Sequence, residues 1–94
     1  MSTVMSADRI YFMLREIKSI AMEASLTGGM KKGSKTLATM YNRCLETLRE
    51  NDPAISTLFE PLTEDASVDE IGVSAALLSR YMRPNQDHLE EDDY

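Results

Sequence analysis

The sequence predicts an all-α protein: a small helical bundle built on a helix-loop-helix hairpin, with a short third helix, a fourth helix and a disordered acidic C-terminal tail. Three observations support this fold class. Apolar residues recur at spacings of three and four, as in a helix with one buried side. Residues that favour helix ends stand between these stretches. No stretch shows the strict alternation of apolar and polar residues that a half-buried strand requires.

The first helix is expected to begin after Ser6, which can cap it, and to carry Asp8 in its first turn, where a carboxylate suits the helix dipole. Gly28 and Gly29 are expected to end it, because glycine is favoured just beyond a helix C-terminus. Its apolar stripe consists of Ile10, Met13, Leu14, Ile17, Ala21 and Ala24.

The second helix is expected to be capped by Ser34 or Thr36 and to end at "NDP", Asn51 to Pro53. Its stripe consists of Leu37, Met40, Tyr41, Cys44, Leu45 and Leu48.

A short third helix is expected next, with Asp52 as its cap and Pro53 as its first residue, where a missing N–H is tolerated. It is predicted to stop near Pro61 and to carry Ile55, Leu58 and Phe59.

The fourth helix is introduced by "SVDE", Ser67 to Glu70, which has the spacing of a capping box. Gly72 inside it is expected to lower its stability by about 1 kcal/mol relative to alanine, and Pro84 is expected to end it. Almost no apolar residue follows, so the sequence divides into a helical domain, 1–84, and an acidic disordered tail, 85–94. The stripe of this helix consists of Val68, Ile71, Ala75, Leu78 and Met82.

The composition fits one folded domain: 94 residues, 43% hydrophobic and 28% charged, with a net charge of −6. A single cysteine excludes an internal disulfide framework and favours a reducing compartment. The N-terminus lacks a signal-peptide pattern, and the longest apolar run, Ile10 to Leu14, is far shorter than a membrane span. We therefore expect a cytoplasmic protein that does not enter a membrane.

The stretch "TGGMKKGSKT", Thr27 to Thr36, resembles a phosphate-binding loop at first sight. A true loop of that kind places lysine directly after the second glycine and follows a buried strand. Here Ser34 separates Gly33 from Lys35, and the stretch follows an amphipathic helix. A hinge between two helices is therefore the first interpretation.

Binding of an anion is the alternative for the loop 28–36. Lysines near a helix N-terminus oppose the helix dipole, and an anion would relieve that repulsion. The candidate anion-binding residues are Lys31, Lys32, Ser34 and Lys35, with the acidic tail as one candidate anion.

Catalysis and metal binding are not expected, and no cofactor is predicted. The only histidine, His88, lies in the tail, which offers no rigid frame for a catalytic group. One histidine and one cysteine are too few for an ordinary zinc site. Cys44 lies on the apolar stripe of the second helix and is interpreted as a small buried hydrophobic residue.

A partner surface is predicted on the first helix, because its first half is apolar nearly all round. The candidate interface residues are Tyr11, Phe12, Arg15 and Met22. The alternative is that this second apolar side packs under the fourth helix of the same chain.

The charge distribution bears on possible partners. Residues 28–50 carry five basic and two acidic groups, whereas residues 51–94 carry two basic and eleven acidic groups. This acidic half opposes nucleic-acid binding, which depends largely on neutralised phosphates. The sequence therefore favours a non-catalytic regulatory or adaptor protein acting through protein-protein contacts, as a homodimer or with a protein partner. An anion- or nucleotide-sensing module is the alternative, and a nucleic-acid-associated regulator comes third.

Overall fold

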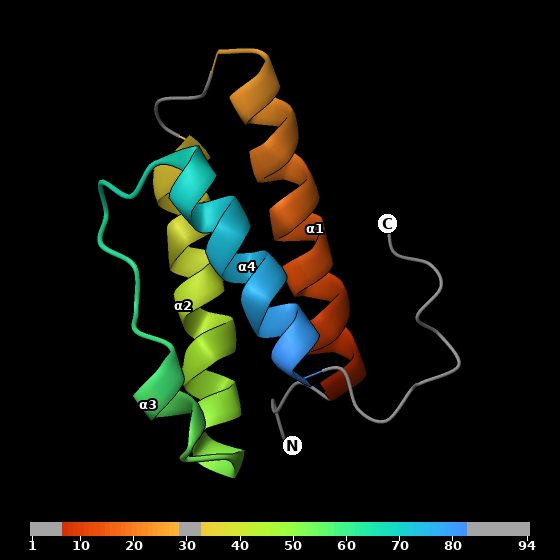
Figure 1. Cartoon of the computed structure of the whole chain (residues 1–94), viewed down its shortest axis with the longest axis vertical. Coiled ribbons are helices and arrows are strands. Elements are labelled where there is room, and N and C mark those ends of the chain that lie inside the picture. Colours follow the sequence, from red (N-terminus) through yellow and green to blue (C-terminus); the bar gives the residue numbers. More distant parts are fainter. Residues whose placement is uncertain (1–6, 29–32, 83–94) are drawn as a thin grey trace.

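The computed structural model describes residues 7–28 and 33–82, and these residues form four helices and no strand (Figure 1). Helices α1 (Ala7–Leu26) and α2 (Gly33–Asn51) form an antiparallel hairpin. The single-turn helix α3 (Ile55–Leu58) lies at the far end of α2, and α4 (Val68–Met82) lies across the hairpin. The predicted all-α fold is confirmed.

Helix α4 runs antiparallel to α1, and its contact with α1 is the most extensive between any two of these helices. The connection 59–67 allows α4 to run antiparallel to α1, because it returns along α2 from α3 to the beginning of α4 (Figure 1). The first and last helices of the chain, α1 and α4, therefore pack directly against each other.

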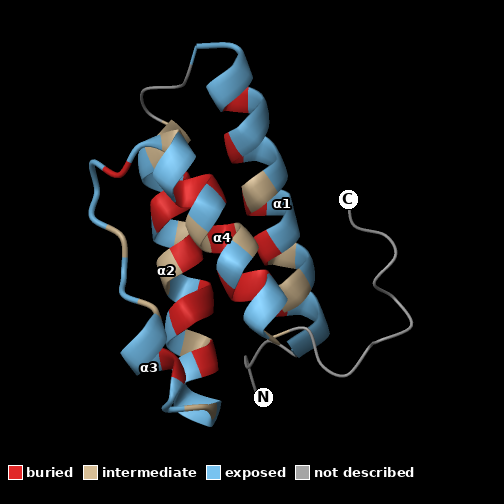
Figure 2. Cartoon of the chain, viewed as in Figure 1, coloured by how far each residue is buried: buried red, intermediate tan, exposed pale blue. Residues whose placement is uncertain are grey.

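The core lies between α1, α2 and α4 (Figure 2). The predicted stripes of these helices supply most of it, and only Met13, Met40, Val68 and Met82 among the stripe residues are half-buried. The structure adds Ala38 of α2 and Ala66 of the connection 59–67 to the core. The buried apolar residues in the core cluster are Ile10, Leu14, Ile17, Ala21, Leu37, Ala38, Tyr41, Cys44, Leu45, Leu48, Ile55, Ala66, Ile71, Ala75 and Leu78.

Two helix ends follow the predicted local chemistry. After α1, Gly28 adopts a φ of 105°, a conformation that L side chains rarely adopt. Before α4, the Ser67 hydroxyl accepts a hydrogen bond of 3.1 Å from the Glu70 backbone N–H, as an N-cap residue should. The predicted end of α1 at Gly28 and the predicted cap of α4 by Ser67 are thus both confirmed.

Several local expectations were wrong. Helix α2 begins at Gly33, so Ser34 and Thr36 lie inside its first turn instead of capping it. Helix α3 carries Ile55 and Leu58 but ends there instead of near Pro61, because the chain becomes extended at Phe59. Phe59 packs against the Tyr81 ring, with ring centroids 5.7 Å apart, and Leu58 is 62% exposed.

Asp52 does not cap α3 as predicted, because the N-cap residue of this helix is Ala54 and no side chain caps it. The Asp52 carboxylate accepts a hydrogen bond from the Ala54 N–H at 3.2 Å, and the helix starts at Ile55 instead of Pro53. The same carboxylate accepts a hydrogen bond of 3.1 Å from the Tyr81 hydroxyl, which ties this turn to the end of α4.

One side chain holds the connection 59–67 against α2. The Asn42 amide donates to the Leu62 carbonyl at 2.9 Å and accepts from the Leu62 N–H at 2.8 Å. Because both backbone groups of Leu62 are paired by one side chain, the position of the connection along α2 is fixed.

Several expectations concern residues outside the described part of the chain. These are Ser6, Gly29, Lys31, Lys32, Pro84, His88 and the tail 85–94. Among the described residues, no helix is both long enough and apolar enough to cross a membrane.

Candidate functional site

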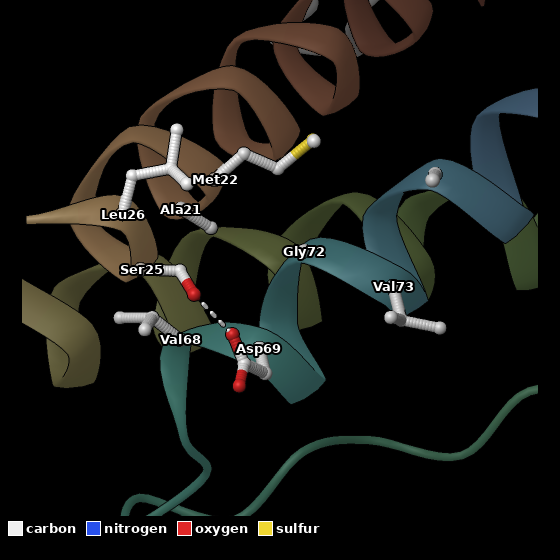
Figure 3. Close-up of a pocket in the computed structure, with 9 residues that line it drawn as sticks. Ala21, Met22, Ser25, Leu26, Val68, Asp69, Gly72 and Val73 are labelled. Atoms are coloured by element: carbon white, nitrogen blue, oxygen red, sulfur yellow. Dashed lines mark hydrogen bonds between the residues drawn. The ribbon is translucent and has the colours of Figure 1, made fainter. Parts of the chain in front are cut away.

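The candidate site begins with the close approach of α1 and α4 at Gly72. A Cβ atom added to this buried glycine would lie 3.4 Å from the Ala21 Cβ and 3.8 Å from the Met22 Cγ. A side chain larger than that of alanine would therefore push the helices apart. The absence of a side chain at Gly72 and the small side chain of Ala21 set the separation of the two helices here (Figure 3).

Beside this crossing, α1 and α4 form a shallow groove with a volume of about 350 Å³. Its walls are mainly apolar, and its polar contact is a hydrogen bond of 2.5 Å from the Ser25 hydroxyl to the Asp69 carboxylate (Figure 3). The groove is lined by Ala21, Met22, Ser25, Leu26, Val68, Asp69, Gly72, Val73 and Ala76.

Large apolar side chains stand exposed around this groove. Met22 and Leu26 of α1 are 52% and 85% exposed, and Val73 and Leu77 of α4 are 59% and 54% exposed. Leu77 follows Val73 by one helical turn, so the two lie on the same side of α4. We call these four residues the α1–α4 surface. Single exposed apolar residues are common, but a contiguous group is typical of an interaction site.

The predicted interface residues do not all line one hollow in the structure. Met22 lines the groove beside α4 and is 52% exposed. Tyr11 is half-buried, and the Arg15 guanidinium carbon lies 5.8 Å from the centre of its ring. Phe12 is 62% exposed and lines a separate hollow with Asp8, Arg9 and Met13.

Two of the four predicted anion-binding residues can be described. Ser34 is half-buried in the first turn of α2, and the exposed Lys35 ammonium group lies 3.6 Å from the Glu64 carboxylate. Glu64 belongs to the connection 59–67, so an acidic group of the same chain already offsets the charge of Lys35. Lys31 and Lys32 lie outside the described residues.

Burial favours the neutral forms of two ionisable side chains in the core, Cys44 and Tyr41. Cys44 and Tyr41 are each 1% exposed. Burial raises the pKa of the Cys44 thiol, and burial together with the nearby Cys44 raises the pKa of Tyr41 to about 12. A thiolate nucleophile requires a lowered pKa and access to substrate, so Cys44 acts as a core residue. Within the described ranges, no three His, Cys, Asp or Glu side chains gather as a metal ion would need.

Sequence reasoning missed Leu26, Val73 and Leu77 as surface residues and Gly72 as a packing residue. A signal was present for the apolar ones. Val73 and Leu77 are four residues apart and fall off the stripe of the fourth helix, and Leu26 likewise falls off the stripe of the first. Apolar residues outside the buried stripe of a helix indicate a second covered side.

Comparison with known proteins found no match: no protein-family model, no curated protein and no solved structure matches this chain. The functional inference therefore rests on the residues of the chain itself.

Proposed function

We propose that this chain is a small non-catalytic regulatory or adaptor protein that acts through protein-protein contacts and associates with itself. The observation that carries the proposal is the α1–α4 surface, where exposed apolar side chains from two helices surround one groove. A groove with a flexible methionine on its edge also suits an apolar partner, because methionine adapts its shape to what it contacts.

The exposed area supports a reversible interaction. Complete burial of a large aliphatic side chain is worth roughly 1.5–3 kcal/mol, and these four side chains are between 52% and 85% exposed. Each can therefore contribute on the order of 1 kcal/mol when a partner covers it. Association itself costs roughly 4–15 kcal/mol, so the surface needs apolar residues from the partner as well. This balance favours a contact that forms and dissociates.

The anion-sensing alternative receives less support. The Lys35 ammonium lies 3.6 Å from the Glu64 carboxylate, so one of the proposed anion-binding groups already has an anionic neighbour. We accordingly propose that the loop 28–36 serves as the hinge of the α1–α2 hairpin.

The proposal is tested with the double variant Leu26→Glu, Val73→Glu in the full-length chain. Leu58→Glu is the matched control, because Leu58 is also an exposed leucine, at 62%, but lies on α3 away from the groove. We expect the double variant to lose self-association in light scattering and partner capture in pull-downs, while the control keeps both. Far-UV circular dichroism should show the same helical content in all three proteins.

A second arm tests the residues predicted from sequence. The double variant Tyr11→Glu, Phe12→Glu should have a smaller effect than the groove variant, because Phe12 lines a separate hollow. Equal association in the wild type, the groove variant and the Leu58 control would contradict the proposal. A selective loss in the Tyr11, Phe12 variant would move the interface to the N-terminal half of α1.

A further inference from the structure

We propose that the occupant of the α1–α4 surface is a second copy of this chain, paired through an antiparallel two-fold contact of α4 with α4. This inference rests on the proposed function and adds to it the identity of the partner and the direction of the pairing. It is based on the order of charged and apolar residues along one side of α4.

The outward side of α4 carries an acid at one end and a base at the other. Asp69 lies in the first turn and Arg80 in the last, and both are exposed. Their separation of eleven positions is close to three whole turns, so they lie on the same side of the helix. Val73 and Ala76 lie between them and line the groove.

This order is complementary to itself when it is reversed. The midpoint between Asp69 and Arg80 coincides with the midpoint between Val73 and Ala76. A two-fold axis that crosses α4 at right angles at this point places Asp69 of each copy beside Arg80 of the other and brings the apolar centres together. In such an isologous interface every contact occurs twice. A parallel pairing would instead place like charges beside each other.

Within the described residues, neither of the two end charges, Asp69 and Arg80, forms an ion pair. The Ser25 hydroxyl donates to Oδ1 of Asp69 and so orients the carboxylate at the mouth of the groove. An oriented carboxylate loses less conformational freedom when it meets a guanidinium group than a mobile one does.

Charge reversal tests both the partner and the direction. Sedimentation equilibrium of the full-length wild type, Asp69→Arg, Arg80→Glu and the double variant should be measured over a wide concentration range. Each single reversal should raise the dimer dissociation constant at least about tenfold, because two attractive pairs become repulsive. The double variant should return to within about threefold of the wild type, because the pairs are then restored in swapped form.

Two controls separate these effects from changes within the monomer. Arg49→Glu also reverses a base in the last turn of a helix, here α2, and should leave the dissociation constant unchanged. Asp69→Asn keeps an oxygen that can accept the Ser25 hydrogen bond and removes the charge, so it should give an intermediate dissociation constant. Circular dichroism of every variant confirms that the helices are intact.

Different failures have different meanings. A dimer that resists both single reversals but is lost in the Leu26, Val73 variant would overturn the antiparallel pairing and leave the proposed function in place. A wild type that stays monomeric at every concentration would overturn the second copy as occupant. If a different protein were then captured through the same surface, the regulatory or adaptor role of the proposed function would stand and its self-association would be overturned. No self-association and no capture would overturn both.

Discussion

Replacement of Gly72 by alanine adds one methyl group at the crossing of α1 and α4. Two effects favour the variant. Alanine is about 0.8–1.0 kcal/mol better than glycine inside a helix, and the methyl group would be buried, since Gly72 itself is buried. Burial of one such group is worth about 0.8 kcal/mol.

One effect opposes the variant. The new Cβ would lie 3.4 Å from the Ala21 Cβ, at the short limit of ordinary carbon contacts, and 3.8 Å from the flexible Met22 side chain. The α1 backbone carries the Ala21 Cβ directly, so any relief of this close contact would come from a small displacement of one helix. We expect a net stabilisation of about 0.5–1 kcal/mol for Gly72→Ala, after part of the gain is lost to this displacement. Gly72→Val adds further atoms and should instead destabilise by about 2 kcal/mol.

The assay is urea unfolding followed by far-UV circular dichroism, with the free energy extrapolated to water. Gly28→Ala is the contrasting control. At Gly28 nothing lies within 4 Å of an added Cβ, but φ is 105°, so strain should destabilise this variant by about 1–2 kcal/mol. The two glycines thus have opposite predicted signs. A loss of more than about 1 kcal/mol in Gly72→Ala would refute the reasoning, because it would mean that the helices cannot yield at this contact.

Three further predictions concern single side chains and are checked by the same unfolding assay. Asn42→Ala should destabilise by about 2 kcal/mol, because both hydrogen bonds to the Leu62 backbone are lost; Asn42→Asp should also destabilise, because its carboxylate keeps the acceptor but cannot donate to the Leu62 carbonyl. Ser67→Ala should cost about 1 kcal/mol, since the Glu70 N–H loses its cap, whereas Ser67→Asp should cost little. Tyr41 has a folded-state pKa raised from 10.0 to about 12, so its contribution to stability is present below pH 10 and lost as the pH rises through 12; Tyr41→Phe should weaken this alkaline loss of stability.

The helices were predictable because their signals are local. The stripe from Ile10 to Ala24 and the Ser67 cap depend on residues within a few positions of each other, and the structure confirms both. The Gly28 turn is equally local. Each of these patterns needs no knowledge of the rest of the chain.

The candidate site was less predictable because it depends on contacts between distant residues. Met22 could be identified as lying off the buried stripe, but its neighbour on α4, Gly72, is known only once α4 is placed. The ion pair of Lys35 with Glu64 and the pairing of Asn42 with Leu62 likewise join positions far apart in sequence. No local pattern contains such information.

The extensive contact between α1 and α4 has a consequence for the order in which this protein can fold. Ala21 in α1 and Gly72 in α4 are close in space but separated by two other helices along the chain. During synthesis, the apolar side of α1 remains without its main neighbour until residues 68–82 have emerged from the ribosome. Contacts of this sequence separation slow folding, and an exposed apolar helix is prone to unwanted association. At that stage of synthesis, α1 is therefore the part of the chain that is most prone to unwanted association.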